Sequence, residues 1–405
     1  MRNVYAGRDG GHTAPADARR RPDKERSDAA SASRDGTSSA AEGAPCAAGT
    51  AGAPGPAAAA PLGALDLGTN NCRLLVARPE ADDFRVIDAF SRPVRLGEGM
   101  ERTGSLSDAA QERALRALRI CAAKLRQHRV AGSRVIATEA CRRADNGRAF
   151  ARRVQRETGL NMRVISTEEE ARLAVAGCAP LVDPEAEHLL VVDIGGGSTE
   201  LIWVDMSHTP ACKRLALVRA LAPLMPGDTC QNARAAAAHI ADWVSVPLGV
   251  STLHDRFAGI DCDRARFDAM AGAFGAALVS FRPCQRVDRC DLGDRLQIIG
   301  VSGTATTFGA LHLGLKVYDR AKVDGMWLDC ADAAAITERL IDLGPDGRSR
   351  CPGVGRNRCD MVVAGAAILS TILNLWLTRR MRVADRGLRE GILYGLMHHN
   401  RLACD

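Results

Sequence analysis

A turn of three consecutive glycines between two carboxylates is the segment of this sequence best suited to chemistry. Asp193 and Glu200 flank Gly195, Gly196, Gly197, Ser198 and Thr199. Glycines let backbone N–H groups approach an anion closely, the two hydroxyls add donors, and the flanking carboxylates could hold a hydrated Mg²⁺ against phosphate oxygens. The alternative is a plain hairpin turn, which also needs glycines. Because the pattern occurs twice, we favour the phosphate-binding interpretation.

An earlier segment has the same outline. Asp66 ends an apolar strand, a polar turn with Thr69 and Asn70 follows, and a second apolar strand begins with Arg73 near its start. The two aspartates are 193 − 66 = 127 residues apart, so the sequence contains an internal repeat of domain size. If the two turns face each other, a phosphate chain between them is held from both sides, with Arg73 as a charged donor.

Three consecutive glutamates begin a predicted helix near residue 167. With Thr167 as the N-cap, Glu170 stands three residues on and fits a capping box. From spacing alone, this structural role is favoured. The competing hypothesis is that one glutamate faces the cleft and polarises a water for in-line attack on a terminal phosphorus.

Two further segments carry anion-binding residue types. Arg142 lies where a short strand leads into a helix, a suitable place to contact an anion. Gly303 and Thr304 belong to a third apolar strand that runs into a Gly/Thr turn. The arginines of the helix after Arg142 could prolong a positive path, although a solvated basic face is the commoner explanation.

Alternating helix and strand patterns position these motifs, as in an α/β fold. Helices are predicted near 107–129, 147–158, 167–176, 231–246, 263–280, 332–343, 361–377 and 386–398, and further strands at 134–137, 162–165 and 296–301. Residues 1–60 have almost no large apolar side chains, which predicts a disordered tail. We place one domain at 61–186 and a second at 187–405.

Composition excludes several classes of protein. A net charge of +6 over 405 residues is mild and aromatics make up only 4%, so nucleic acid is not an expected partner. The apolar run 361–377 is shorter than the roughly 20 residues that span a bilayer, which predicts a buried helix and no membrane association. No secretory signal pattern opens the sequence and its 14 cysteines form no C-x-x-C pair. We therefore expect a cytoplasmic protein with reduced thiols.

Seven motifs in order resemble the exopolyphosphatase and guanosine pentaphosphate phosphohydrolase family (Ppx/GppA). They are ALDLGTNNCRLLVA, ATEACRRADNG, STEEEARLAVAG, VVDIGGGSTEL, GVSGTATT, RCDMVVAGAAIL and GLREGILYGL. The first motif of the family usually reads Asp-x-Gly-Ser-Asn-Ser, whereas this chain has Thr69 and Asn71 at the two hydroxyl positions. No HD-type domain follows residue 400, so the chain resembles the short form of the family.

The resemblance implies two ribonuclease-H-like domains of the actin-like and sugar-kinase-like superfamily, with the active site between them. It carries the catalytic glutamate onto Glu170 and a phosphate-contacting arginine onto Arg142. The implied cofactor is Mg²⁺, with Asp66, Asp193 and Glu200 as its candidate ligands. The remaining candidate phosphate-binding residues are Thr69, Asn70, Arg73, Gly195 to Thr199, Gly303 and Thr304.

The function that the resemblance implies is Mg²⁺-dependent release of the terminal phosphate from inorganic polyphosphate, from guanosine pentaphosphate, or from both. The second substrate would connect the protein with the stringent response. The alternatives are a non-catalytic sensor that binds an alarmone or polyphosphate, and an ATPase or kinase of the same superfamily. A homodimer is compatible with the fold by analogy alone.

Overall fold

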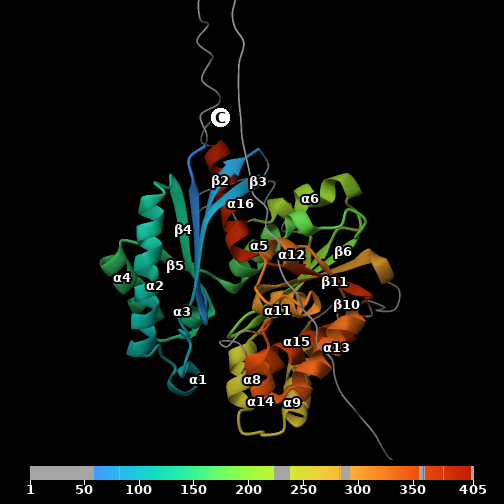
Figure 1. Ribbon diagram of the computed structural model, residues 1–405. Coiled ribbons are helices and arrows are strands. Elements are labelled where there is room, and N and C mark those ends of the chain that lie inside the picture. Colours follow the sequence, from blue (N-terminus) through green and yellow to red (C-terminus); the bar gives the residue numbers. More distant parts are fainter. Residues whose placement is uncertain are drawn as a thin grey trace, which may run out of the picture. The chain divides into compact units, whose positions relative to one another are not determined.

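Two mixed β-sheets organise the chain (Figure 1). The computed structural model describes residues 59–402, except 82, 223–237, 282, 284–291, 355–358, 360 and 377. The first sheet has the strand order β3-β2-β1-β4-β5. Its strands are β1 (Leu62–Leu67), β2 (Asn71–Glu80), β3 (Asp83–Pro93), β4 (Gly132–Ala137) and β5 (Met162–Val164).

The second sheet has the strand order β10-β11-β9-β6-β7-β8. Its strands are β6 (His188–Ile194), β7 (Thr199–Asp205), β8 (Ile240–Val246), β9 (Leu296–Val301), β10 (Trp327–Asp329) and β11 (Arg380–Ala384). In each sheet the first strand pairs antiparallel with the next, β1 with β2 and β6 with β7. Each first strand also pairs parallel with the strand after a crossover, β1 with β4 and β6 with β9. The repeated hairpin thus lies in two sheets of the same topology, and the expected α/β fold with two ribonuclease-H-like lobes is confirmed.

Helices cover both faces of each sheet. In the first half of the chain they are α1 (Met100–Thr103), α2 (Asp108–Gln127), α3 (Glu139–Arg143), α4 (Gly147–Thr158), α5 (Thr167–Gly177) and α6 (Ala211–Ala220). In the second half they are α8 (Val250–Arg256), α9 (Asp263–Ala277), α11 (Ser302–His312), α12 (Arg320–Val323), α13 (Cys330–Asp342), α14 (Gly344–Arg350), α15 (Val362–Leu375) and α16 (Leu388–Leu402). Short 3₁₀ helices occur at Ala179–Leu181, Leu278–Ser280 and Gly293–Arg295.

Four apolar cores hold these layers together. Helices α2 and α4 pack on one face of the first sheet, and α16 packs on the other. Helices α8, α9, α11, α13 and α15 share a core with one face of the second sheet, and α5 and α6 share a core with its other face. Because α16 packs on β1, the end of the chain returns to the first sheet. Ala58–Asp405 clusters as one unit, and the predicted boundary at 186/187 stays a prediction.

Helix α5 belongs to the cores of both sheets. Leu173 packs in the core between α16 and the first sheet, whereas Ala171 and Val175 pack against the second sheet. Helices α5 and α16 are also in direct contact. The start of α5 is therefore held rigidly where the two sheets meet.

The prediction of a helix near 231–246 is wrong for the second half of that range, which the structure describes. Residues 240–246 form strand β8, which pairs antiparallel with β7. The alanines at 235–238 favour a helix, but Ile240, Trp243 and Val244 have the β-branched or aromatic side chains that suit a strand completing a sheet. Residues 231–237 and the predicted tail up to residue 58 lie outside the described residues.

The apolar run near 361–377 forms a core helix, as predicted. Helix α15 buries most of its side chains against α8, α9, α11 and α13. Among the helices that the structure describes, none is both long enough and apolar enough to cross a membrane.

Candidate active site

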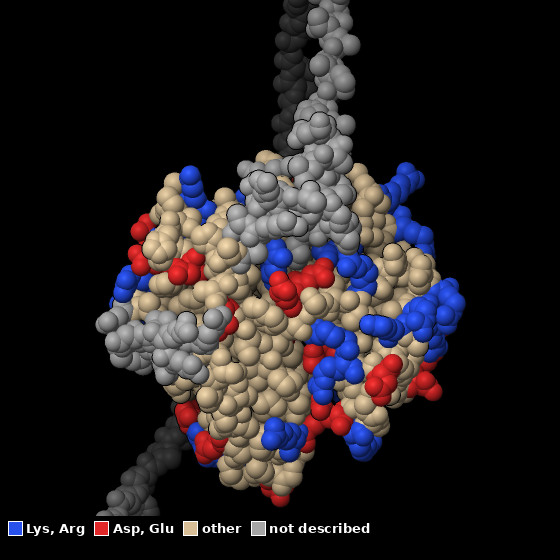
Figure 2. Space-filling view, turned by 180° about the vertical axis from the view of Figure 1, so that it is seen from behind, with Lys and Arg blue, Asp and Glu red and all other residues tan. Residues whose placement is uncertain are grey.

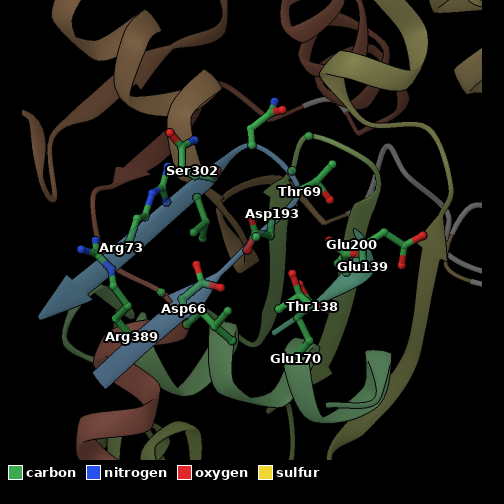
Figure 3. A pocket seen from close by; sticks show the side chains of 18 of the residues that line it. Asp66, Thr69, Arg73, Thr138, Glu139, Glu170, Asp193, Glu200, Ser302 and Arg389 are labelled. Carbon is green, nitrogen blue, oxygen red and sulfur yellow. The ribbon is translucent and has the colours of Figure 1, made fainter. Parts of the chain in front are cut away.

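The two repeated hairpins meet at one polar cleft, which we call the inner compartment (Figure 3). It encloses about 100 Å³. The structure brings together eleven of the predicted site residues around it: Asp66, Thr69, Asn70, Arg73, Glu170, Asp193, Gly195, Gly196, Gly197, Ser198 and Glu200. Strands β1 and β6 both end at this cleft, as expected where parallel strands of an α/β sheet terminate.

Strand register places two charged pairs across the hairpins. Asp66 lies opposite Arg73 on β1 and β2, and Asp193 lies opposite Glu200 on β6 and β7. In both hairpins the second member follows the aspartate by seven residues (73 − 66 and 200 − 193). The first pair joins opposite charges and the second joins like charges.

The glycine turn is tied down on its carbonyl side. The backbone N–H groups of Gly249, Val250 and Ser251, at the start of α8, donate to the carbonyls of the glycine turn, Gly197, Gly195 and Gly196 respectively. A trans peptide points its N–H opposite to its carbonyl. The N–H groups that follow these carbonyls therefore point away from α8, and the turn residues line the inner compartment. This is the geometry of an anion-binding turn.

The cap of α5 is Ser166 and not Thr167, which corrects the predicted capping arrangement. The Ser166 hydroxyl accepts a hydrogen bond from the Glu169 N–H, at 3.1 Å. Glu169 therefore occupies the capping-box position, and it also pairs with Arg134. Glu170, one residue further along, turns its side chain into the cleft instead. The structural explanation favoured by spacing does not apply to Glu170.

Glu170 is buried and is held by one arginine. Arg142 donates one Nη to Glu170 Oε2 at 2.9 Å and the other to Glu139 Oε2 at 2.6 Å. Burial raises the pKa of Glu170 well above its usual range, the negative charge of Glu200 raises this pKa further, and Arg142 only partly offsets both effects. A carboxylate in this setting is a stronger base than an exposed one.

The other carboxylates of the inner compartment also have raised pKa values. Burial raises the pKa of Asp66 to about 6, with Arg73 and Arg389 opposing this shift. Burial and the charge of Asp193 raise the pKa of Glu200 to about 7. Burial likewise raises the pKa of Asp193. Glu200 keeps hydrogen bonds from Ser198 Oγ at 2.6 Å and from Ser245 Oγ on β8 at 2.8 Å.

These carboxylates fit a bound divalent cation. The buried Oδ1 of Asp66 has no hydrogen-bond partner among the described atoms, and burial raises the pKa values of Asp66 and Glu200. Within the described ranges, no three Asp, Glu, His or Cys side chains converge as a complete metal cage. Mg²⁺ commonly binds proteins through only one or two carboxylates and completes its shell with water and substrate phosphates. Asp66, Asp193 and Glu200 suit that mode of binding.

A second cavity, the outer compartment, shares lining residues with the first, has both polar and apolar walls and encloses about 270 Å³. Gly303 and Thr304, at the start of α11, line this cavity and not the inner one. The predicted turn after β9 is therefore the first turn of a helix that follows the strand directly. The predicted phosphate-binding residues are thus distributed over two connected cavities.

Three predicted site residues are engaged in other contacts. Thr199 is fully buried, and its hydroxyl donates to the Leu248 carbonyl at 2.9 Å. Arg142 lines neither compartment, since it binds Glu139 and Glu170. Asn70 lines both compartments, but its amide donates to Ser251 Oγ at 2.7 Å, a contact between the two lobes. Whether these residues contact a phosphate stays a prediction.

Sequence reasoning did not assign several residues that line the inner compartment. Thr138 and Glu139 follow β4, and Ser302 follows β9 at the equivalent point of the second sheet. Residues 385–390 form a further wall that carries Arg389, which faces the cleft beside Arg73 and Asp66 in Figure 3. The only sequence signal was that these residues lie inside or beside the motifs shared with the family.

The wall at 385–390 is braced from outside the cleft. Asp324 pairs with Arg386 at 2.6 Å, and Arg320 donates to Glu390 at 2.7 Å. Glu390 in turn accepts from the Gly387 N–H at 2.9 Å. These contacts occupy Arg386 and leave Arg389 as the arginine of this wall whose charge is directed at Asp66.

The arginines of α4 form a solvated face. Arg148, Arg152 and Arg156 are exposed, and Arg153 pairs with Glu157 and Glu112. The view from behind shows many Lys and Arg side chains on the side of the first sheet (Figure 2). None of these four arginines lines either compartment, so the commoner explanation of a basic solvent face holds.

The duplicated sheets and the acidic cleft at their strand ends define the class, a two-lobed α/β protein with a site for charged ligands. Comparison with protein-family models matches residues 75–400 to the Ppx/GppA phosphatase family. The chain belongs to this family, and the family implies a phosphatase-type hydrolase.

Solved structures agree with this placement. An exopolyphosphatase from Cytophaga hutchinsonii is 25% identical with a TM-score of 0.68, over 84% of this chain and 98% of that one. An exopolyphosphatase-like protein is 26% identical with a TM-score of 0.68, over 84% and 99%. A PPX-GPPA enzyme of Aquifex aeolicus is 26% identical with a TM-score of 0.64, over 83% and 99%.

Proposed function

We propose that the protein is an Mg²⁺-dependent hydrolase that releases the terminal phosphate of inorganic polyphosphate, of guanosine pentaphosphate, or of both. The observation that carries this proposal is the position of Glu170. Its buried carboxylate faces the two anion-binding turns and has a pKa raised by burial. A protein that only binds phosphate has no need of a base in this place.

The chain's own groups divide the work of the proposed reaction. The amides of the glycine turn bind the terminal phosphoryl group, the Ser198 hydroxyl orients Glu200, and Arg73 and Arg389 add positive charge at the cleft. Glu170 accepts a proton from the water that attacks the terminal phosphorus in line. Arg142 orients Glu170 through their 2.9 Å contact. The leaving group is the shortened phosphate chain.

Asp66, Asp193 and Glu200 would hold the metal. A bound Mg²⁺ supplies charge that offsets the negative charge of the phosphates and of the three carboxylates. With the metal bound, the negative charge of these three buried carboxylates no longer repels a polyanionic substrate. The raised pKa values of Asp66 and Glu200 support this assignment, because burial disfavours their ionised forms and a bound cation would favour them.

The test is phosphate release from polyphosphate, guanosine pentaphosphate and ATP, with Mg²⁺, by the wild type and by Glu170→Gln. We expect release from at least one of the first two substrates, and a fall of about 10²–10⁴-fold in kcat in the variant, the usual contribution of a general base. Glu168→Gln is the matched control because Glu168 is an exposed glutamate on the same turn of α5. It should keep wild-type activity.

Each other outcome has a definite meaning. Near-wild-type turnover by Glu170→Gln would remove Glu170 as the base. Binding of polyphosphate or guanosine pentaphosphate without release would favour the non-catalytic sensor. Turnover of ATP alone would favour an ATPase of the same superfamily.

A further inference from the structure

The guanidinium of Arg389 faces the cleft without a side-chain contact that holds it. It lines the inner compartment beside Asp66 and Arg73 (Figure 3), and it has no hydrogen bond with any described residue. We propose that Arg320, which lies on α12 and lines neither compartment, is a positioning residue that aims Arg389 into the site of reaction. This inference rests on the proposed function, in which the charge of Arg389 acts on the phosphates.

The direction of Arg389 depends on the backbone that carries it. An arginine side chain without a partner samples many rotamers, so the fold fixes only where the side chain starts and which way it leaves the helix. Arg389 lies in the first turn of α16, directly after the wall residues 385–387. The contacts that fix this turn therefore decide where the charge of Arg389 acts.

Arg320 connects the two ends of this turn. Its Nη2 donates to the Asp385 carbonyl and to Glu390 Oε1, both at 2.7 Å. The other carboxylate oxygen of Glu390 accepts from the Gly387 N–H at 2.9 Å, which is the return hydrogen bond of a capping box. One guanidinium thus joins the residue that precedes the turn to the glutamate one position after Arg389.

The ion pair of Arg320 and Glu390 is buried on the carboxylate side. Only 2% of the Glu390 side chain is exposed, against 35% of the Arg320 side chain. Among the described residues, Arg320 is the one that forms an ion pair with Glu390. Removal of one partner leaves a buried charge unpaired, which strongly favours any rearrangement that gives it a new partner. Without Arg320, the first turn of α16 is therefore expected to shift.

Two neighbours of Arg320 hold the same wall. Tyr318 Oη donates to Asp385 Oδ2 at 2.8 Å, and Asp324 Oδ1 accepts from the Asp385 N–H at 3.0 Å. Both residues belong to the segment 318–324, which contains α12. Together with the bond from Arg320 to the Asp385 carbonyl, this short segment contacts the N–H, the carbonyl and the side chain of one wall residue. Such a brace fixes the backbone at the point where α16 begins.

The same turn is packed tightly on α5, the helix that carries the proposed base. A Cβ on Gly177 of α5 would overlap the Gly387 carbonyl oxygen, and a Cβ on Gly391 of α16 would overlap the Leu173 carbonyl oxygen. Backbone packed on backbone leaves no space for movement of the turn toward α5. The directional hydrogen bonds of Arg320 resist displacement in other directions. Arg389 and the proposed base are thus kept in a fixed relation to each other.

The experiment is a double-mutant cycle on Arg320 and Arg389, with kcat/KM for phosphate release from polyphosphate and guanosine pentaphosphate measured with Mg²⁺. Arg389→Gln should lower kcat/KM about tenfold, the value of one charge-assisted hydrogen bond. Arg320→Gln should cause a loss of similar size, about tenfold, in the otherwise unchanged protein. When Arg389→Gln is already present, it should cost less than about twofold, because two changes that act through one group are not additive.

Stability distinguishes positioning from a merely structural role. Urea midpoints of all four proteins are measured in parallel, and Arg320→Gln should lower the midpoint equally with and without Arg389→Gln. Only the activity should show the coupling. An equal fold-loss of kcat/KM in the two backgrounds would overturn the proposal, and so would unchanged kcat/KM in Arg320→Gln.

Lys322→Gln is the matched control, since Lys322 is an exposed cation of α12 that lines neither compartment. It should leave kcat/KM unchanged in both backgrounds. If Arg320→Gln does not fold, Arg320→Lys takes its place in the cycle, because it keeps a positive charge beside buried Glu390. The expected loss is then smaller, and it should again disappear in the Arg389→Gln background.

Binding separates this inference from the proposed function. The same cycle is measured by calorimetry as the Kd of pyrophosphate, in proteins that also carry Glu170→Gln so that turnover does not consume the ligand. If the wild type releases no phosphate, the hydrolase fails, and a Kd effect of Arg320→Gln that disappears in the Arg389→Gln background still supports the positioning role. If the wild type releases phosphate and both cycles are additive, the hydrolase stands and the positioning role fails. Neither release nor binding would overturn both proposals.

Discussion

The two hairpins of the repeat share a backbone but differ in charge. In the first, Asp66 lies opposite Arg73, so that the two facing residues carry opposite charges. In the second, Asp193 lies opposite Glu200, and burial of these like charges raises both pKa values. The duplicated topology therefore supplies two equivalent positions for a turn. The side chains give one hairpin two opposite charges and the other two negative charges.

The turns of the two hairpins also differ, in the size of their side chains. The first has the side chains of Thr69 and Asn70, and the amide of Asn70 reaches Ser251 on the other lobe. The second has three glycines, and a Cβ on Gly196 would lie 2.7 Å from the Asn70 amide nitrogen. The first turn can therefore approach the second this closely only because residue 196 is a glycine.

Among the tests of this comparison between the hairpins, the largest expected effect comes from removing the charge of Glu200. Glu200→Gln should lower kcat by about 10²–10³-fold, the range for loss of one electrostatic element of a preorganised site. The same change should raise the free energy of unfolding of the metal-free protein at neutral pH, because it removes a buried charge beside Asp193. Arg73→Gln in the first hairpin should lower that free energy, because it removes one of the two arginine charges that stabilise ionised Asp66 and leaves only Arg389.

Urea denaturation of both variants in EDTA, with phosphate release measured in parallel, checks this prediction. Stability changes of the same sign in the two variants would show that the hairpins do not differ in charge compensation.

A smaller effect concerns the packing behind the two turns. A Cβ on Gly249 would lie 2.5 Å from the Gly196 carbonyl oxygen and 2.6 Å from that of Gly195, both backbone atoms. A Cβ on Gly68, in the first turn, would meet its nearest atom at 3.6 Å. Gly249→Ala should therefore cost about 1–3 kcal/mol of unfolding free energy, as overpacking typically does, whereas Gly68→Ala should cost less. Urea midpoints measure the difference, and equal midpoints would contradict the proposed bracing of the glycine turn by α8.

The two hairpins could be predicted from the sequence because the strands of the repeat are strongly apolar. The spacing of the two aspartates identified both hairpins, and the strand at 296–301 coincides with β9. The predicted N-cap of α5 was wrong because Ser166 and Thr167 are both good N-cap residues. Only the backbone conformation decides which of them begins the helix.

Contacts between segments far apart in the chain could not be predicted from the sequence. Glu139 and Arg389 reach the cleft from α3 and α16, and nothing in their local spacing places them beside Asp66. Ser245 reaches Glu200 only because β8 is a strand, where the alanine-rich run before it favours a helix. Thr199 looked like a phosphate ligand, but the alternation of side chains along β7 turns its hydroxyl toward Leu248.

The most direct test of cation dependence is the change of stability with pH. Asp66 and Glu200 have pKa values raised to about 6 and about 7 in the folded protein, above the usual values of 3.8 and 4.5 for these side chains. Groups of this kind contribute stability that is fully present below the unfolded pKa and is lost as the pH rises through the folded pKa. The metal-free protein should therefore lose roughly 4 kcal/mol of unfolding free energy between pH 5 and pH 8.

Mg²⁺ binds the ionised carboxylates, so it should restore this stability at pH 8 and have little effect at pH 5. Urea midpoints at the two pH values, with Mg²⁺ and with EDTA, measure the difference. In Glu200→Gln the loss between pH 5 and pH 8 should shrink, because only Asp66 and Asp193 still titrate in the two hairpins. A Mg²⁺ effect of equal size at both pH values would show that the cation binds away from these carboxylates. The difference in charge between the first hairpin, with Asp66 and Arg73, and the second, with Asp193 and Glu200, would then have no bearing on metal binding.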